Sequence, residues 1–506
     1  MGHSHDGSLK QVHVITRHGS RRQLPKDADS LSESETAIDS LLTPLGQQQQ
    51  YQLGVWLREH YSNSSTTGFA DNVLAEYDPI RVHVESSAYE RTLVSAQSLL
   101  LGLFPSATRG LQLIPETPPV IPIYSKARHN DFDLRAYDKC PTYHDTLEKL
   151  YNTQTWRQME FNSMHLLRKL ALIPAFSEYA QHLDGEYIPL KDIWNVYDLI
   201  QVAMAECGTA GSYFYDACRD LPDPSVATSI QGEDWTAVRE LAHAVELLKF
   251  GADMAESKVG GPLLDRIATR MDKYQGSAEQ QKLYLYSAHY PTLLGLYAAM
   301  NIPFHEEGVI PEYASALIFE VHQGTEYWKF YVRIFYKSGT STELSPIHLS
   351  DTCRTDVKDG CDLFSFLQEI RTRRLTPTEW CTACGNTKAD ACLQHQLELH
   401  HPAQSSCSSH NNSRYAAVYF AGMVSTLMIL MVWNTFCKQR PTVRSSTKTD
   451  EFHDHVQPEE DFVQNHNGQP QQNGHEEEGV FVQNNGYPQN DAPVPPPVIT
   501  SDAMLA

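Results

Sequence analysis

Residues 12–21 read VHVITRHGSR, an apolar run that ends in two arginines around one histidine. The β-branched residues predict a strand, and Arg-His-Gly predicts a loop where that strand ends. Arginine pairs with phosphate oxygens in two places at once, and a neutral imidazole can act as a covalent nucleophile. The alternative is an exposed basic turn, and the motif alone does not decide between the two.

Two further segments favour the functional interpretation. Residues 81–93 predict a strand, a turn of small residues and a helix with Arg91 near its start, and residues 283–292 predict a strand that ends at His289. Ligands of open α/β sheets bind at the carboxyl ends of the strands. We therefore expect four residues to hold a phosphate that His18 attacks: Arg17, Arg21, Arg91 and His289.

The chain resembles the histidine acid phosphatases, in particular the membrane-anchored lysosomal and prostatic branch. The matching motifs follow the family's order over roughly residues 10–370: Arg17-His18-Gly19-x-Arg21, Leu42-Thr43-Pro44-Leu45-Gly46, Glu90-Arg91-Thr92-Leu93, Gly260-Gly261-Pro262-Leu263-Leu264, Tyr286-Ser287-Ala288-His289 and Pro311-x-Tyr313-Ala314-Ser315. The resemblance implies an α/β fold of the phosphoglycerate-mutase type, with a mixed sheet, flanking helices and a helical insertion over the substrate cleft.

The resemblance also implies an activity, the hydrolysis of phosphate monoesters without a metal or other cofactor. His18 would be phosphorylated, and water would then release inorganic phosphate. Arg17, Arg21, Arg91 and His289 would hold the phosphoryl oxygens through the transition state.

One position departs from the family. The family has His-Asp, where the acid protonates the departing alcohol, and this chain has His289-Tyr290. A phenol has an ordinary pKa of about 10, so its proton is harder to transfer at acidic pH. Three interpretations stay open: Tyr290 is a weak acid, another group or water takes the role, or the chain is a catalytically weakened or non-catalytic phosphate-ester-binding membrane protein.

The pattern along the chain predicts an α/β domain in two parts, residues 8–130 and 281–370, interrupted by a helical insertion at 131–280. Beyond it we expect three further segments: a cysteine-containing stalk at 371–414, a transmembrane helix at 415–436 and a disordered acidic tail at 437–506. The net charge of −22 argues against nucleic acid as a partner.

Residues 415–436 contain no charged side chain and, as a helix, would be about 33 Å long, enough to cross a bilayer. A buried core helix is the alternative. More basic residues follow this segment than precede it, which predicts a single-pass protein with a cytoplasmic C-terminus. The catalytic part would be lumenal or extracellular, in the lysosome or at the cell surface. Residues 1–10 are polar, so we expect an export signal ahead of this sequence.

The ten cysteines agree with an oxidising compartment. Cys353 and Cys361 bracket a short loop and are predicted to form a local disulfide. The resemblance implies that Cys140 pairs with Cys207 or Cys218, because those positions pair in the family.

Cys381-x-x-Cys384, with Cys392 and His395, has the spacing of a zinc site. In an oxidising compartment we favour disulfides over zinc for these cysteines.

Three weaker signals concern partners and modification. Asn63 and Asn411 each begin a glycosylation triplet, and residues 493–497 read PVPPP, either a polyproline ligand or a stiff linker. The sequence does not define the oligomeric state, and a homodimer is one alternative.

Overall fold

The computed structural model describes residues 8–24, 41–62, 69, 73–105, 120–180, 186–207, 226–275, 281–303, 310–339, 341–356 and 360–400. All of them belong to one compact unit, Met1–Cys407. No helix of this part of the chain combines the length and apolarity needed to cross a bilayer. The predicted span at 415–436, the acidic tail with its proline run, and the triplets at Asn63 and Asn411 lie outside the described residues.

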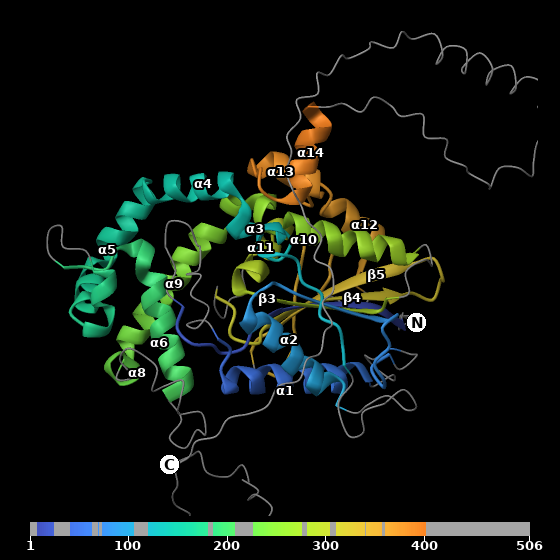
Figure 1. Cartoon of the computed structure of the whole chain (residues 1–506), viewed down its shortest axis with the longest axis horizontal. Coiled ribbons are helices and arrows are strands. Elements are labelled where there is room, and N and C mark those ends of the chain that lie inside the picture. Colours follow the sequence, from blue (N-terminus) through green and yellow to red (C-terminus); the bar gives the residue numbers. More distant parts are fainter. Residues whose placement is uncertain are drawn as a thin grey trace, which may run out of the picture. The chain divides into compact units, whose positions relative to one another are not determined.

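The centre of the fold is a mixed sheet (Figure 1). Its strands are β1 (Ser8–Arg17), β2 (Val82–Ser86), β3 (Leu283–Ala288), β4 (Ala316–Gln323), β5 (Phe330–Lys337), β6 (Ser345–Pro346) and β7 (Cys361–Asp362). Their order is β2-β3-β1-β4-β5-β6, and β7 also pairs with β5. β1, β2 and β3 are parallel, whereas β4 runs antiparallel to β1 and β5. The predicted mixed α/β fold is therefore confirmed.

Strand β1 is buried on both faces, although polar residues such as Gln11, His13 and Thr16 interrupt its apolar ones. Val12 and Val14 pack with α1 (Pro44–Ser62) and α2 (Glu90–Leu103), and Ile15 belongs to the core on the opposite face. That second core is formed with α10 (Ala252–Gln275), α11 (Tyr290–Met300) and α12 (Leu363–Glu369). The sheet thus lies between two helical layers (Figure 1).

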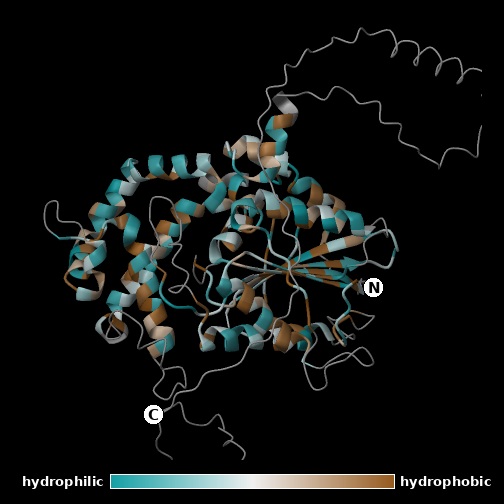
Figure 2. Ribbon diagram, viewed as in Figure 1, coloured by the Kyte–Doolittle hydropathy of each residue, from teal (hydrophilic) through white to brown (hydrophobic). Residues whose placement is uncertain are grey.

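A block of helices separates α2 from β3 along the chain. It contains η2 (Arg128–Asn130), α3 (Ala136–Lys139), α4 (Pro141–Tyr151), α5 (Gln154–Ala171), η3 (Pro174–Tyr179), η4 (Leu190–Asp192), α6 (Ile193–Cys207), α8 (Val226–Ser229) and α9 (Glu233–Phe250). Apolar and polar residues interleave along these helices (Figure 2), as expected for helices that bury one face. They share a hydrophobic core of their own, to which Tyr290 at the start of α11 also belongs.

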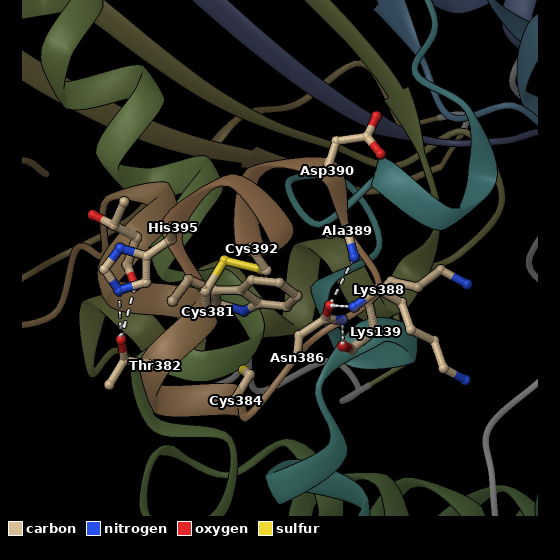
Figure 3. Close-up of a disulfide and its surroundings, with 12 residues drawn as sticks. Lys139, Cys381, Thr382, Cys384, Asn386, Lys388, Ala389, Asp390, Cys392 and His395 are labelled. Carbon is tan, nitrogen blue, oxygen red and sulfur yellow. Dashed lines mark hydrogen bonds between the residues drawn. A yellow bond between two sulfur atoms is a disulfide. The ribbon is translucent and has the colours of Figure 1, made fainter. Parts of the chain in front are cut away.

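The segment that we expected to be a stalk differs from that expectation in its described part. Residues 377–400 form α13 (Pro377–Cys384) and α14 (Asp390–His400). Trp380 is fully buried in the core of the helical block, where its ring stacks on Phe132 at 5.0 Å between centroids. Asn386 Nδ2 donates to the carbonyl of Lys139 at 2.6 Å (Figure 3). The low apolar content of residues 371–414 did not reveal that a few large side chains anchor this segment.

The cysteine predictions have mixed outcomes. The local disulfide Cys353–Cys361 is confirmed. The preference for disulfides over zinc is also confirmed, because Cys381 pairs with Cys392 (Figure 3) and Cys384 with Cys140. The family-based pairing of Cys140 with Cys207 or Cys218 was therefore wrong. Residue Cys207 forms a separate disulfide. The error arose because the folding of α13 against α4 brings together two cysteines that are 244 residues apart.

Candidate active site

Three loops follow the parallel strands β1, β2 and β3 at one edge of the sheet. β1 and β3 pair with Arg17 opposite Ala288, and β2 joins β3 in parallel as well. Parallel strands end at the same edge, so the residues that directly follow them lie together: His18, Ser87 and His289.

The five predicted site residues gather at this edge and are almost completely buried. Their exposed fractions are 1% for Arg17, 3% for His18, 2% for Arg21, 1% for Arg91 and 2% for His289. The rings of His18 and His289 meet edge to face with centroids 5.5 Å apart, and Arg91 Nη2 lies 3.3 Å from His289 Nδ1. We refer to these five residues as the basic cluster. Cations and imidazoles are buried together only at a cost, which an anion between them would offset.

His18 is held as a neutral ring with a defined tautomer. Its Nδ1 lies 2.8 Å from the carbonyl oxygen of Gly19. A carbonyl can only accept, so Nδ1 carries the hydrogen and Nε2 keeps its lone pair. Burial lowers the pKa of His18 well below its usual value of 6.5, and three guanidinium groups lower that pKa further: Arg91, Arg17 and Arg21.

Two of the arginines are fixed by partners within the fold. Arg21 makes a two-pronged ion pair with Asp198 on α6, with Nη2–Oδ1 at 2.8 Å and Nη1–Oδ2 at 3.0 Å. Arg17 donates through Nη1 to the carbonyl of Pro311, and its guanidinium lies 4.1 Å from the ring centroid of Tyr313. The helical block therefore contributes directly to the site, through the carboxylate that orients Arg21.

His289 lies at the junction of β3 and α11, where its extended backbone (φ −126°) begins the helix. Its N–H donates to Thr292 Oγ1 at 3.4 Å. Two side chains approach its Nε2: Ser87 Oγ at 2.8 Å and Arg135 Nη1 at 3.2 Å. The imidazole is thus contacted on both ring nitrogens, by Arg91 on one side and by this pair on the other.

Tyr290 begins α11 but directs its hydroxyl into the helical block. The hydroxyl donates to Glu246 Oε2 at 2.9 Å, and Glu246 Oε1 lies 3.6 Å from Lys249 Nζ. The ring stacks on Trp194 with centroids 6.0 Å apart. Burial raises the pKa of Tyr290 well above 10, and the neighbouring Glu246 carboxylate raises that pKa further. The hydroxyl at the family's proton-donor position is therefore neither acidic nor free.

Sequence reasoning missed four residues of this environment: Ser87, Arg135, Asp198 and Glu246. Arg135 and Asp138 stand three residues apart at the start of α3, a spacing that can form an ion pair on a helix, and this was the one readable signal. The two missed carboxylates lie on helices with partners far away in sequence, so no local pattern marks them.

Gly19 lies where the loop after β1 meets the start of α1. In the structure, a Cβ atom on Gly19 would stand 2.2 Å from the carbonyl oxygen of Gly46. The glycine therefore allows the loop after β1 to touch the start of α1.

Metal ligands are not grouped in the part of the chain that the structure describes: no cluster of three or more His, Cys, Asp or Glu side chains there could hold an ion.

Comparison with known proteins identifies the family. The sequence pattern described as "Histidine phosphatase superfamily (branch 2)" matches residues 25–337, which is more than half of the chain. The chain therefore belongs to the histidine phosphatase superfamily, branch 2. The match begins at residue 25, after the Arg-His-Gly-x-Arg motif at residues 17–21. The motif is therefore additional support for the family from outside the matched range.

The curated relatives are acid phosphatases. "Putative acid phosphatase 5" of Caenorhabditis elegans is 28% identical over 386 residues, covering 75% of this chain and 79% of the relative. Prostatic acid phosphatase of Bos taurus is 27% identical, covering 74% and 87%, and lysosomal acid phosphatase of Rattus norvegicus is 26% identical, covering 74% and 80%. The chain is accordingly a phosphomonoester hydrolase of the histidine acid phosphatase family.

Solved structures support the fold alone. A phytase from Klebsiella sp ASR1 has a TM-score of 0.52 and 16% identity, covering 73% of this chain and 96% of that structure. The apo form of a Hafnia alvei phytase has a TM-score of 0.51 and 16% identity, covering 76% and 99%.

Proposed function

We propose that this phosphomonoester hydrolase acts through a phosphohistidine on His18. Nε2 attacks phosphorus, the ester P–O bond breaks, and its electron pair leaves with the alcohol oxygen. Water then attacks the phosphohistidine, and inorganic phosphate departs as the imidazole recovers its lone pair. Arg17, Arg21, Arg91 and His289 hold the phosphoryl oxygens, which is the positioning and charge stabilisation that phosphoryl transfer requires.

The observation that carries this proposal is the state of His18. The 2.8 Å contact with the Gly19 carbonyl leaves Nε2 as the nitrogen with the lone pair. Because the pKa of His18 is lowered well below 6.5, the ring stays neutral and nucleophilic in mildly acidic solution.

The direct test is to trap the intermediate. The protein is mixed with an aryl phosphate labelled at phosphorus and quenched in alkali, which preserves phosphohistidine. We expect the label on His18 after proteolysis. Turnover of the substrate without label on this residue would contradict the proposal.

We also propose that the missing proton donor limits which esters are hydrolysed. Tyr290 donates to Glu246 and has a raised pKa, so it does not protonate the leaving oxygen. Aryl phosphates release weakly basic phenolates, which need little protonation, whereas alkyl phosphates release strongly basic alkoxides, which need a proton as they leave. We therefore assign good leaving groups, such as phenols, as the preferred class and water as the proton source.

A cavity of about 450 Å³ is lined by Ile310 and Glu312, which flank the Pro311 carbonyl that Arg17 contacts. In this proposal it houses the alcohol part of an ester. It lies between α6, α9 and the segment before β4, and its lining includes Tyr197, Trp235, His243 and Glu312. The rings of Tyr197 and Trp235 stack with centroids 5.6 Å apart. In this proposal the α/β parts (residues 8–130 and 281–370) carry the chemistry, and the insertion (131–280) shapes the leaving-group side.

The second candidate is a phosphate-ester-binding membrane protein with little or no turnover. The observation that favours it is the same commitment of Tyr290 to Glu246. Phosphate release from an aryl phosphate by purified protein separates the two, because a binding protein would retain the ester unchanged.

We propose a lumenal or extracellular location for the phosphatase unit, in the lysosome or at the cell surface. All seven described cysteines are disulfide-bonded, as expected in an oxidising compartment. In the proposed topology residues 415–436 anchor the unit as a single-pass helix and residues 437–506 face the cytoplasm. Alkaline extraction of membranes, followed by protease protection, tests this; release of the full chain by alkali would rule out the anchor.

A further inference from the structure

Beyond the expected phosphate-binding residues, a fourth guanidinium reaches the basic cluster. Arg135 is fully buried, and its Nη1 lies 3.2 Å from His289 Nε2. Asp138 fixes the opposite edge of the guanidinium, with Nε and Nη2 at 3.2 and 3.0 Å from Oδ2. The plane of the group also lies over the ring of Tyr89, 4.2 Å from its centroid. A side chain held at three points is well placed to orient its neighbour.

The donors and acceptors around His289 show how this contact can affect the tautomer of the ring. Arg135 and Arg91 can only donate, and they approach Nε2 and Nδ1 respectively. A neutral imidazole has one N–H and one lone pair, so in either tautomer one arginine faces a ring N–H. Ser87 Oγ does not decide the tautomer, because its hydroxyl can either donate to Nε2 at 2.8 Å or donate to Thr92 Oγ1 at 3.0 Å and accept from an Nε2–H.

An anion bound in the basic cluster favours one of the two tautomers of His289. A phosphoryl oxygen placed between Arg91 and His289 accepts from both, so it removes the donor–donor conflict at Nδ1 but not the one at Nε2. The favourable arrangement then has the hydrogen on Nδ1, directed at the phosphoryl oxygen. The lone pair on Nε2 accepts from Arg135 and Ser87.

We propose that Arg135 is a positioning residue that holds His289 as the neutral Nδ1–H tautomer, the form that donates to the phosphoryl group. This inference rests on the proposed function, because it requires an oxyanion in the basic cluster. Since the arginine also opposes a second proton on the ring, His289 donates to phosphate without having to become charged. Substrate binding then depends little on the protonation of this histidine at acidic pH.

The charged and titratable groups that face His289 come from several elements. They are Arg91 on α2, Arg135 just before α3, His18 after β1, and Tyr89 just before α2, whose ring meets that of His289 edge to face with centroids 5.5 Å apart. Behind Arg135 lie Asp138, which it pairs with, and Asp131, whose carboxyl is buried and has its pKa raised to about 6. Because Asp131 titrates at mildly acidic pH, any pH-dependent effect must be assigned to His289 by a residue-specific signal.

The test compares Arg135→Met with Arg128→Met. Arg128 also lies over Tyr89, at 4.3 Å from the ring centroid, but no contact with His289 is recorded for it. Asp138 keeps Lys139 as a partner at 3.0 Å when Arg135 is replaced, which limits the damage to the fold. Nitrogen NMR of the labelled imidazole reports the tautomer, and inorganic phosphate is the probe ligand, added in excess over each variant's inhibition constant.

We expect phosphate to shift His289 of the unmodified protein and of Arg128→Met to the Nδ1–H form. In Arg135→Met a larger fraction should remain Nε2–H, donating to Ser87. Phosphate should inhibit this variant about tenfold more weakly near neutral pH, as for the loss of one charge-assisted bond. That inhibition should tighten on acidification, when the ring can gain its second proton, and Arg135→Lys should restore part of the loss.

Identical tautomers and identical pH dependence of phosphate inhibition in the two Met variants would overturn the inference. If Arg135→Met fails to fold, Arg135→Lys carries the test, because a shorter donor without the fork should also leave more Nε2–H form. Absence of phosphate binding and aryl phosphate turnover in the unmodified protein would instead contradict the proposed function.

Discussion

The basic cluster and the leaving-group side of this site are built in different ways. The cluster residues follow the ends of parallel strands or lie in the first turn of α2, and their positions follow from the sheet register. Tyr290, one residue beyond His289, belongs instead to the core of the helical block through Trp194 and Glu246. Two adjacent residues thus have different main partners, although the ring of Tyr290 also lies 5.4 Å from the guanidinium of Arg17.

This difference indicates that the two halves of phosphoryl transfer can change independently. In the proposed mechanism, binding and attack depend on the sheet edge, where charge is concentrated. The residue that follows His289 instead carries a side chain that packs in the insertion. A substitution there can alter which esters are cleaved while the phosphate-binding residues stay intact.

The strongest test of the sheet-edge half is His18→Ala. Without the nucleophile, aryl phosphate turnover should fall by at least about 10³-fold, because the remaining residues only bind and polarise. Initial rates and phosphate inhibition are measured together. Phosphate should still bind to the variant, since four of the five cluster residues remain. Retained turnover would show that the reaction occurs elsewhere.

The leaving-group half is tested by Tyr290→Asp. A carboxyl group beside Glu246 should have a raised pKa because of burial and the neighbouring negative charge, so it can supply a proton at mildly acidic pH. We expect kcat for an alkyl phosphate to rise about 10²-fold and kcat for an aryl phosphate to change much less. Both rates are measured on the same preparation, with thermal unfolding as a check of the fold.

Tyr290→Phe is the matched control. It keeps the ring against Trp194 and removes only the hydroxyl. The ratio of aryl to alkyl turnover should stay unchanged. A selective loss on the alkyl ester would mean that the phenol does donate a proton, and the contrast between the two halves would disappear.

The point where the two halves meet is the pair of Arg21 with Asp198. Asp198→Asn keeps the shape but removes the charge that holds both guanidinium nitrogens. We expect kcat/KM for an aryl phosphate to fall about tenfold, because a misdirected Arg21 contributes less to the transition state. Steady-state kinetics measures this change. An unchanged value would show that Arg21 needs no support from the helical block.

Much of the sheet-edge half could be predicted from the sequence. A strand pattern followed by an arginine, histidine or small-residue turn places those residues at one edge once the strands are parallel. Arg17, His18, Arg21, Arg91 and His289 were all identified in this way and are brought together.

The remainder depends on contacts between distant segments and could not be predicted. The Cys140–Cys384 disulfide and the burial of Trp380 follow from how α13 packs on the helical block. The same holds for Glu246, which appears in sequence as one more charge on an amphipathic helix. Its role depends on Tyr290, which is 44 residues away.

The smallest predicted effect is the change of kcat/KM with pH, which reports the protonation state of His18. An imidazole with an ordinary pKa of 6.5 would be half protonated at pH 6.5 and about 90% protonated at pH 5.5, so a nucleophile would lose about fivefold in rate over this range. The pKa of His18 is lowered, so the neutral form persists as the pH falls through this range. We therefore expect kcat/KM for an aryl phosphate to change less than about twofold between pH 6.5 and 5.5. The second ionisation of the substrate is measured by phosphorus NMR and factored out. A fivefold fall would mean that burial and the arginines do not lower the pKa of His18, and the sheet edge would then lack the electrostatic character that distinguishes it from the Tyr290 side.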